Sequence, residues 1–410
     1  MARVFLVVMD SVGIGGAPDA DRFFNGDIPD SGSNTLGHIA QACAQGRAEE
    51  GRTGLLHLPH LCALGLGAAM RLALGQDGKN EAVAGNTDAM TNLGLGAEIK
   101  GKWGAASEAS PGKDTPTGHW ELAGVPVPWA WHYFPDETPA FPTEIVAKVC
   151  KLAGADGILG NCHASGTAII AQHGLDHMKT GRPICYTSAD SVFQIAAHEQ
   201  TFGLDRLLNL CQELAPTLHA MKVGRVIARP FVGDGPATFE RTTNRKDFAI
   251  APPAPTLCDR VQGGGRPVHA IGKIGDIFSM SGIDDVVKGS DAVLMTHLAK
   301  AVETAKDGSL TFANFVEFDS LYGHRRDISG YARALEWFDA ELGPILKNLR
   351  PNDMMIFTAD HGNDPSWIGT DHTRERVPVL VAGQGGGELG LLPFVGVAHM
   401  AAKHLGIDWT

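Results

Sequence analysis

The chain has 410 residues, more than one hydrophobic core usually supports, so we expect two domains. Hydrophobic residues make up 44% and charged residues 20% of it, a balance that excludes a mainly disordered protein. The formal charge of −12 disfavours a nucleic-acid-binding or anionic-membrane-binding surface, since both require a basic face. An anionic substrate would therefore need a local group of cations or metal ions.

The N-terminal apolar run Val4–Met9 is too short for the core of a signal peptide or for a membrane span. The sequence thus predicts a cytoplasmic protein without membrane contact. The seven cysteines are scattered and form no CxxC pair, which indicates reduced thiols and neither a disulfide framework nor a thiolate zinc site.

Val4–Met9 is continuous, β-branched and followed by a Gly-rich turn, which is typical of a buried parallel strand. Three later runs have the same form: Leu310–Phe318, Met354–Ala359 and Val377–Val381. Between them, Gly330–Asn348 carries apolar residues three or four positions apart and predicts a helix. This alternation predicts an α/β fold with a mainly parallel sheet sandwiched by helices.

The first strand and the last three are expected to share one sheet, so the middle of the chain must form an inserted domain. Pro-rich segments at 125–131 and 251–256 are plausible hinges. We therefore expect core residues 1–128, a smaller α+β cap at 129–252, and core residues 253–410. The Gly- and Ala-rich segment 65–110 is interpreted as loops and short elements.

Acidic and histidine residues follow the predicted strands, where open α/β sheets bind ligands. They are Asp10, Asp319, His324, Asp360, His361 and His372. Taken singly, each is more readily a helix cap or a turn residue. Six carboxylate and imidazole groups at one edge instead favour two divalent ions, and Mn²⁺, Mg²⁺ and Zn²⁺ all suit such ligands.

Two further features bear on phosphate chemistry. The loop GKDTPTGHWE, residues 112–121, offers threonine hydroxyls that nearby metal ions could activate as nucleophiles, although alone it is equally an ordinary turn. The segment between the hinges contains arginines, and Lys273 follows it. Arginines bind phosphate oxygens in pairs, but by themselves these residues could equally form surface salt bridges.

The motifs VVMDSVGIGGAPDA, GKDTPTGHWE, YTSADSVFQIAAHE, GRVIARPFVG, AIGKIGDI, FDSLYGHRRD and TADHGNDPSWIGTDHTRE occur in this order. Together they closely resemble bacterial phosphopentomutases, a family of the alkaline phosphatase superfamily, over about residues 3–382. The Gly- and Ala-rich segment and the C-terminal end depart from the family pattern as we expect it.

The resemblance implies two Mn²⁺ ions, one held by Asp319, His324 and His372 and the other by Asp10, Asp360 and His361. It implies Thr115 as the phosphorylated nucleophile and glucose 1,6-bisphosphate, or a similar bisphosphate, as activator. The residues that it places near the sugar phosphate are Ser188, Asp190, Val192, Arg225, Arg241 and Lys273. The implied reaction interconverts ribose or deoxyribose 1-phosphate and 5-phosphate, with the cap excluding water.

Two alternatives remain open at this point. A phosphoglycerate mutase or metal-dependent phosphatase of the same superfamily would use the same metal ligands, although the related phosphoglycerate mutases use serine as the nucleophile. A non-catalytic metalloprotein that binds a sugar phosphate would need the ligands and the cations but no reactive threonine.

Overall fold

The structure is a computed structural model that describes residues 2–75, 93–94, 96–188 and 190–409. The chain divides into two compact units, one made of Met1–Pro128 and Pro252–Thr410, the other of Trp129–Ala251. We call them the larger and the smaller unit and describe each by itself. No helix in the described ranges has both the length and the apolar character needed to cross a membrane.

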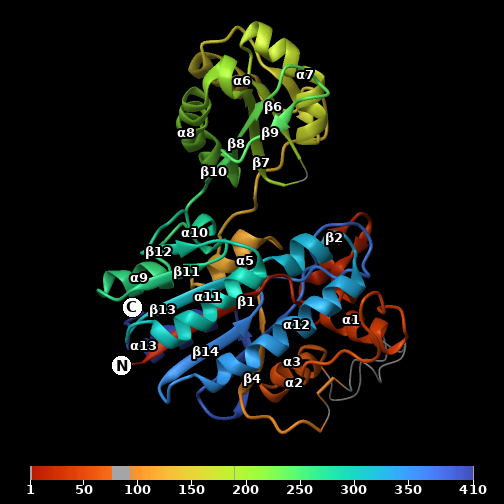
Figure 1. The fold of residues 1–410 in the computed structure, drawn as a ribbon, viewed down its shortest axis with the longest axis vertical. Coiled ribbons are helices and arrows are strands. Elements are labelled where there is room, and N and C mark those ends of the chain that lie inside the picture. The colour runs from red at the N-terminus through yellow and green to blue at the C-terminus, as the bar shows by residue number, and fades with distance from the viewer. Residues whose placement is uncertain (1, 76–92, 95, 189, 410) are drawn as a thin grey trace. The chain divides into compact units, whose positions relative to one another are not determined.

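An eight-stranded sheet forms the centre of the larger unit (Figure 1). Its strand order is β12 (Asp285–Val287), β11 (Val268–Ile271), β13 (Leu310–Phe315), β1 (Arg3–Met9), β14 (Asp353–Thr358), β15 (Val377–Ala382), β4 (Lys102–Ser107) and β16 (Gly387–Pro393). Every residue of β1, β13, β14 and β15 is buried, which explains why these strands are continuous apolar runs. The predicted mainly parallel sheet, built from the first strand and the last three, is confirmed.

One expectation about this sheet was wrong. β15 runs antiparallel to both β14 and β4, although its composition resembles a parallel strand. The connection 359–376 contains no helix that could carry the chain back to the other end of the sheet, so the chain returns directly. The described part of the segment 65–110, expected to be loops and short elements, contains one short helix and the six-residue strand β4, and its residues 76–92 and 95 lie outside the described ranges.

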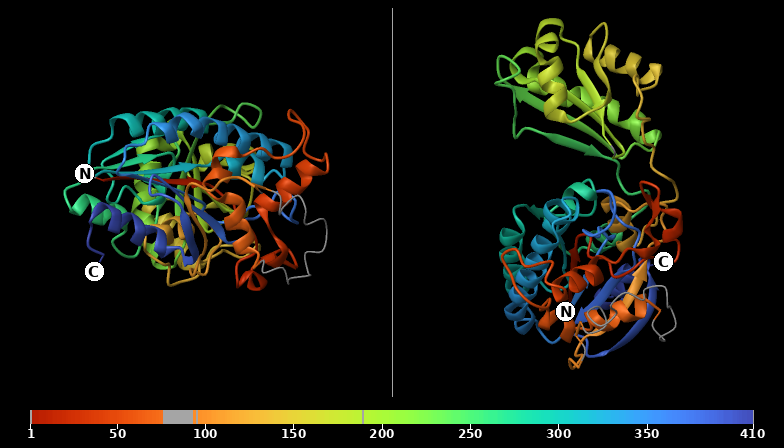
Figure 2. Two further views of the ribbon diagram at one scale, coloured as in Figure 1. Left: turned by 90° about the horizontal axis from the view of Figure 1, so that it is seen from below. Right: turned by 90° about the vertical axis from the view of Figure 1, so that its right-hand side faces the viewer.

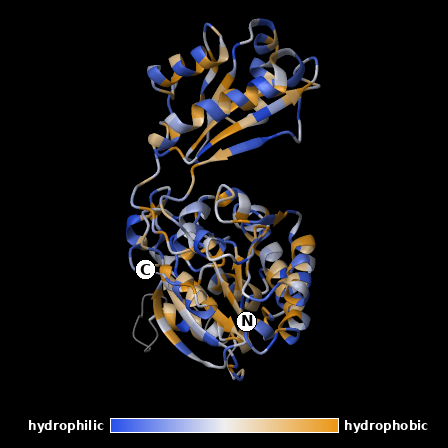
Figure 3. Cartoon of the chain, turned by 90° about the vertical axis from the view of Figure 1, so that its left-hand side faces the viewer, coloured by the Kyte–Doolittle hydropathy of each residue, from blue (hydrophilic) through white to orange (hydrophobic). Residues whose placement is uncertain are grey.

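Helices cover both faces of the sheet (Figure 2). The long α11 (Asp291–Thr304) and α12 (Ile328–Lys347) lie on one side, and α13 (Val395–Leu405) lies on the other and contacts β1. The other α-helices in the described part of this unit are α1 (Thr35–Ala44), α2 (Pro59–Ala63), α3 (Leu66–Ala73), α5 (Thr115–Leu122), α9 (Leu257–Gly263) and α10 (Ile274–Ile277). Hydrophobic residues concentrate on the strands, whereas the helices alternate between hydrophobic and hydrophilic positions (Figure 3).

The predicted helix at 330–348 is α12, which begins two residues earlier. The side chain of Asp327 accepts a hydrogen bond from the Gly330 N–H and caps the first turn. The apolar positions that predicted the helix, Tyr331, Leu335, Phe338, Leu342 and Ile345, are all buried.

The parallel register brings the carboxyl ends of three central strands to one edge. Met9, the last residue of β1, pairs with Phe315, the last residue of β13, and Val8 pairs with Thr358, the last residue of β14. The segments that leave these strands therefore begin side by side, which is where the predicted metal ligands lie.

The smaller unit contains a mixed sheet with its own core. The strand order is β10 (Lys246–Ala249), β8 (Arg225–Val232), β7 (Val192–His198), β6 (Ile184–Thr187) and β5 (Leu159–His163), and β9 (Glu240–Arg241) pairs with β8. One apolar cluster packs the sheet against α6 (Thr143–Ala153) and α8 (Leu204–Ala220), and a second includes residues of α7 (Gly166–Thr180).

Candidate metal centre and nucleophile loop

The first group of possible metal ligands comes from the ends of β1 and β14. Asp10, Asp360 and His361 are buried, and one ligand atom from each lies within 4.8 Å of the others. Nε2 of His361 is 3.2 Å from Oδ2 of Asp360 and 3.7 Å from Oδ1 of Asp10. Both of these carboxylate oxygens are buried without a hydrogen-bond donor, a costly arrangement that a bound cation would relieve.

The backbone between these ligands is held in an uncommon conformation. Ser11 has a φ of 67°, in the left-handed region that a residue with a side chain seldom adopts. This conformation directs its N–H to Oδ1 of Asp360, at 3.0 Å, while its Oγ lies 2.9 Å from the hydroxyl of Tyr331. Such strain often marks a functional site, and here it joins the segments after β1 and β14.

The second group contains Asp319, His324 and His372. Oδ2 of Asp319 is 3.1 Å from Nε2 of His324, and its Oδ1 is 3.5 Å from Nε2 of His372. The expectation that Asp319 ends a strand was wrong, because β13 stops at Phe315 and Asp319 lies in a π-helical turn, Phe318–Gly323. This turn brings Asp319 and His324 to the same place, as π-helical turns at functional sites often do.

The two groups are neighbours. The rings of His361 and His372, one from each group, are stacked with their centroids 4.0 Å apart. The six predicted ligands thus lie together, in two sets with the predicted membership.

The protonation equilibria of this cluster reflect crowded negative charge. Burial, and then the nearby carboxylates of Asp360 and Asp319, raise the pKa of Asp10 well above its ordinary value. Burial alone would also raise the pKa of Asp360, but the neighbouring imidazole groups of His361 and His119 outweigh burial and lower this pKa. Burial opposes protonation of His361, but Asp360 and Asp10 raise its pKa well above the usual range.

These residues therefore fit divalent cations. The donor atoms are carboxylate oxygens and imidazole nitrogens without thiolates, a set that suits Mn²⁺, Mg²⁺ or Zn²⁺. The buried oxygens without donors and the mutual repulsion of the carboxylates both favour added positive charge.

Thr115 is the first residue of α5, beside the first ligand group. Its Oγ1 lies 3.3 Å from Nε2 of His361. Asp114 caps the helix by accepting a hydrogen bond from the Thr117 N–H, and the dipole of the helix start favours an anion nearby. Thr117 is buried and its hydroxyl donates to the carbonyl of Asp114, so the geometry separates the two threonines of this loop.

An arginine that sequence reasoning missed anchors the loop before Thr115. The guanidinium of Arg374 is buried and donates to the carbonyl oxygen of Gly112, at 2.5 Å, and to Oε2 of Glu108, at 2.6 Å. It also forms two hydrogen bonds with Asp19. Arg374 follows His372 by two residues, so it links the loop before Thr115 to a segment with a candidate metal ligand. Its place in the motif GTDHTRE was the available signal.

The predicted sugar-phosphate residues fall in both units. Ser188, Asp190, Val192 and Arg225 lie at one end of the sheet in the smaller unit, where Val192 pairs with Arg225 in the β-ladder. Oδ2 of Asp190 and of Asp247 lie 3.4 and 3.5 Å from the Arg225 guanidinium. Val192 as a whole is buried, and its carbonyl oxygen accepts a hydrogen bond from the hydroxyl of Thr187.

The last two predicted residues differ in their settings. Arg241 is exposed on β9 of the smaller unit. Lys273 belongs to the larger unit, where it is exposed at the start of α10 and its charge acts on the buried Asp291.

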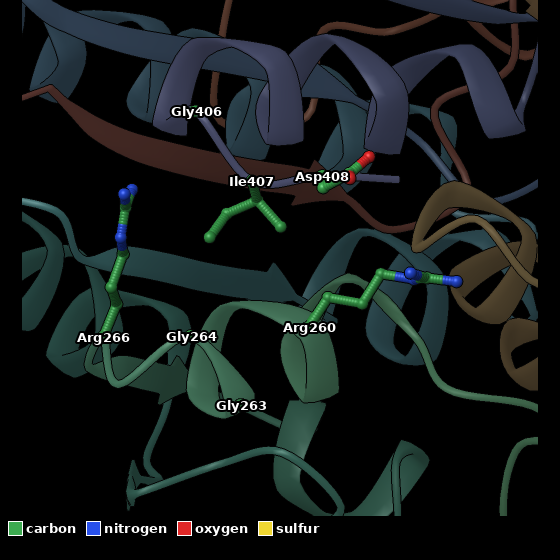
Figure 4. A pocket seen from close by; sticks show the side chains of 7 residues that line it. All are labelled: Arg260, Gly263, Gly264, Arg266, Gly406, Ile407 and Asp408. Atoms are coloured by element: carbon green, nitrogen blue, oxygen red, sulfur yellow. The ribbon is translucent and has the colours of Figure 1, made fainter. Parts of the chain in front are cut away.

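A cavity of about 490 Å³ lies elsewhere in the larger unit (Figure 4). It is lined by Arg260, Gly263, Gly264, Arg266, Gly406, Ile407 and Asp408. Arg266 donates to the carbonyl of Leu405 and Arg260 lies over the ring of Trp409, so both arginines are engaged within the chain. The cavity includes none of the predicted site residues.

Comparison with known proteins places this chain in a family. Residues 2–405 match the metalloenzyme superfamily. A phosphopentomutase of Rhizobium meliloti is 54% identical over 413 residues, which cover 99% of this chain and 98% of the relative. The chain belongs to the phosphopentomutase family. A phosphopentomutase of Chelativorans sp. is 55% identical over 388 residues, covering 94% of this chain and 90% of its own.

Phosphopentomutase membership makes the chain an enzyme that binds divalent metal and has an alkaline phosphatase-like metalloenzyme fold. Among solved structures, the PH0037 protein of Pyrococcus horikoshii is 13% identical, with a TM-score of 0.47 over 99% of this chain and 98% of its own. The assignment does not depend on that likeness.

Proposed function

We propose that the chain performs the phosphopentomutase reaction on ribose and deoxyribose phosphates through a phosphothreonine at Thr115. The observation that carries the proposal is the place of Thr115 Oγ1, at a helix start and 3.3 Å from a nitrogen of the first ligand group. A phosphoryl group there would lie at the positive end of the helix dipole and beside the cations bound nearby.

Asp319, His324 and His372 would hold one metal ion, and Asp10, Asp360 and His361 the other. We propose Mn²⁺, while Mg²⁺ and Zn²⁺ suit the same donors. The bound ions would lower the pKa of the Thr115 hydroxyl and stabilise charge that develops on the transferred phosphoryl group.

The chain's part in the reaction begins with phosphorylated Thr115, formed from an activator such as glucose 1,6-bisphosphate. The C5 hydroxyl of ribose 1-phosphate takes the phosphoryl group from Thr115 Oγ1, which gives ribose 1,5-bisphosphate. The C1 phosphoryl group then passes to Thr115 Oγ1, and ribose 5-phosphate leaves. Arg374 keeps the loop before Thr115 in place during both transfers.

The smaller unit, which we propose as a cap, contains a group of cations suited to a phosphate. The charges of Arg229, Arg241 and Arg245 all act on the phenol of Tyr186, and Arg245 and Arg241 also oppose the charge of the half-buried Arg229. The hydroxyl of Tyr186 is buried without a hydrogen-bond partner, beside Gly166 in the first turn of α7. Clustered guanidinium groups around an unsatisfied hydroxyl favour an anion.

This grouping ranks the predicted substrate residues. Arg225 is already paired with Asp190 and Asp247, whereas Arg241 extends on the exposed β9 beside the first turn of α7. We therefore propose Arg241 as the main ligand of the phosphate group that is not transferred. Ser188, Val192 and Lys273 would lie near the sugar.

Phosphorus NMR of the metal-loaded enzyme tests the reaction. With ribose 1-phosphate and a trace of glucose 1,6-bisphosphate, the ribose 5-phosphate signal should grow without inorganic phosphate. Growth of inorganic phosphate would instead establish a phosphatase, and turnover of 3-phosphoglycerate would establish a phosphoglycerate mutase.

Intact mass tests the nucleophile and excludes a passive binding protein. Incubation with glucose 1,6-bisphosphate should add one phosphate, which ribose 1-phosphate then removes. Thr115→Ala should gain none, whereas the control Thr117→Ser, which keeps the buried hydroxyl, should behave as the unaltered chain. Mutase activity retained in Thr115→Ala would remove Thr115 from this role.

A further inference from the structure

A fully buried histidine connects the nucleophile to the first ligand group. His119 lies one turn after Thr115 in α5, and its side chain has no exposed surface. Its Nδ1 is 2.9 Å from the carbonyl oxygen of Thr115 and 3.1 Å from Oδ2 of Asp360. Both neighbours are oxygen acceptors, so Nδ1 carries a hydrogen and donates it to the Thr115 carbonyl.

The second ring nitrogen, Nε2, lies within hydrogen-bond distance of Asn314 in the buried strand β13. Nδ2 of Asn314 is 2.8 Å from Oδ2 of Asp10 and 3.2 Å from Nε2 of His119. The Asp10 carboxylate can only accept a hydrogen bond, so the atom of Asn314 that faces it is the amide NH₂ group. This group donates one hydrogen to Asp10 Oδ2 and the other to His119 Nε2. The result is a continuous buried path from the Thr115 carbonyl through His119 and Asn314 to Asp10.

Packing alone does not account for these two residues. The His119 ring stacks on Phe312, with centroids 6.0 Å apart, which an apolar ring could do without burying two nitrogens. A second anchor already holds the next residue of α5, where Nε1 of Trp120 donates to the carbonyl of Ile277 at 2.9 Å. The hydrogen bonds of His119 and Asn314 additionally fix the orientation of the start of α5 relative to the carboxylates of Asp10 and Asp360.

We propose that His119 and Asn314 are positioning residues that hold Thr115 in line with the metal site formed by Asp10, Asp360 and His361. The inference rests on the proposed function, since it takes Thr115 as the nucleophile. A group that transfers phosphoryl between two acceptors must be placed within a fraction of an ångström, and a misplacement of about 1 Å costs roughly 100-fold in rate. Loss of the path therefore lowers kcat rather than raising KM.

Two substitutions at position 119 separate the two ring nitrogens. In His119→Asn the side-chain NH₂ takes the place of Nδ1 and still donates to the Thr115 carbonyl. In His119→Gln the amide reaches the place of Nε2, beside Asn314, and the bond to Thr115 is lost. Trp120→Phe is the matched control, because it removes a buried hydrogen bond from the same helix without touching this path.

The measurements are kcat and KM for ribose 5-phosphate, the melting temperature, and the phosphate gained on incubation with glucose 1,6-bisphosphate. We expect His119→Gln to lose roughly 100-fold in kcat with KM changed less than about threefold. His119→Asn should recover most of kcat, and Trp120→Phe should lower the melting temperature while keeping kcat.

The possible failures are distinguishable. If the unaltered chain gains no phosphate on Thr115, the proposed function fails. If it does, but His119→Gln turns over as fast as the unaltered chain, the positioning role is wrong. Equal losses of kcat in His119→Gln, His119→Asn and Trp120→Phe, in proportion to stability, would also overturn it by showing a general packing role.

Discussion

Asp291 is a buried carboxylate whose charge should destabilise the folded protein at neutral pH. It begins α11, is 3% exposed, and its Oδ1 has no hydrogen-bond partner. Burial, and then the nearby Glu317, raise its pKa from 3.8 to about 7. The substitution Asp291→Asn removes the charge, keeps an oxygen that can accept from the Glu317 N–H, and offers an NH₂ group near the Glu317 carboxylate.

The sign of the effect follows from the raised pKa. Between about pH 4 and pH 7 the folded protein retains a proton that the unfolded chain has released, so the folded state is penalised progressively as the pH rises. A pKa difference of one corresponds to about 1.4 kcal/mol, so the penalty grows from about 0.5 kcal/mol at pH 4 to about 4 kcal/mol at pH 8. We expect Asp291→Asn to increase the free energy of unfolding by an amount that follows this curve.

Urea unfolding at pH 5, 6, 7 and 8 measures this difference, with Glu303→Gln as the control. Glu303 is an exposed carboxylate on the same helix, so neutralising it should change stability by less than about 0.5 kcal/mol at every pH. A gain for Asp291→Asn that is the same at pH 5 and pH 8, or a loss at pH 8, would refute the reasoning.

Three further predictions concern the larger unit. Asp353→Asn should cost about 3–5 kcal/mol in urea unfolding, because the fully buried Arg3 loses the carboxylate that binds its Nε and Nη2; a loss below about 1 kcal/mol would contradict this. Gly118→Ala should lower the melting temperature and abolish turnover, because a Cβ there would lie 2.2 Å from the carbonyl oxygen of Asp360; a fully active variant would show that α5 can shift. Removing divalent metal with EDTA should lower the melting temperature, since Asp10 and Asp360 then face each other without a cation; calorimetry that gives equal values with and without EDTA argues against the metal site.

The sequence by itself was enough to locate four of the eight strands of the central sheet. Buried strands must be apolar throughout, so Val4–Met9 and the runs near 310, 354 and 377 were recognisable without partners. Their carboxyl ends then located the acidic and histidine residues that the structure brings into two groups. Local composition reveals these strands and ligands because a strand's apolar character depends on its burial, and a ligand's place depends on where the strand ends. Neither depends on which segment lies alongside.

Strand direction and the exact place of Asp319 depended on the tertiary structure. β15 has the composition of a parallel strand and runs antiparallel, because its direction depends on how the preceding connection returns to the sheet. Asp319 lies in a π-helical turn, since the chain must bring its carboxylate and His324 to one point. Neither choice changes the hydrophobic pattern, so neither was visible in the sequence.

The residues that hold the site in place could not be predicted from the sequence either. Apart from the bond between His119 and Thr115, the buried hydrogen bonds of Arg374, His119 and Asn314 join residues 195 to 304 positions apart in the chain, so the sequence around each residue does not reveal its partner. The sequence by itself determined which side chains could do chemistry, because that depends on residue type. Only the tertiary structure decided which side chains hold them in place, because a buried hydrogen bond exists only once both partners have been brought together and water has been excluded.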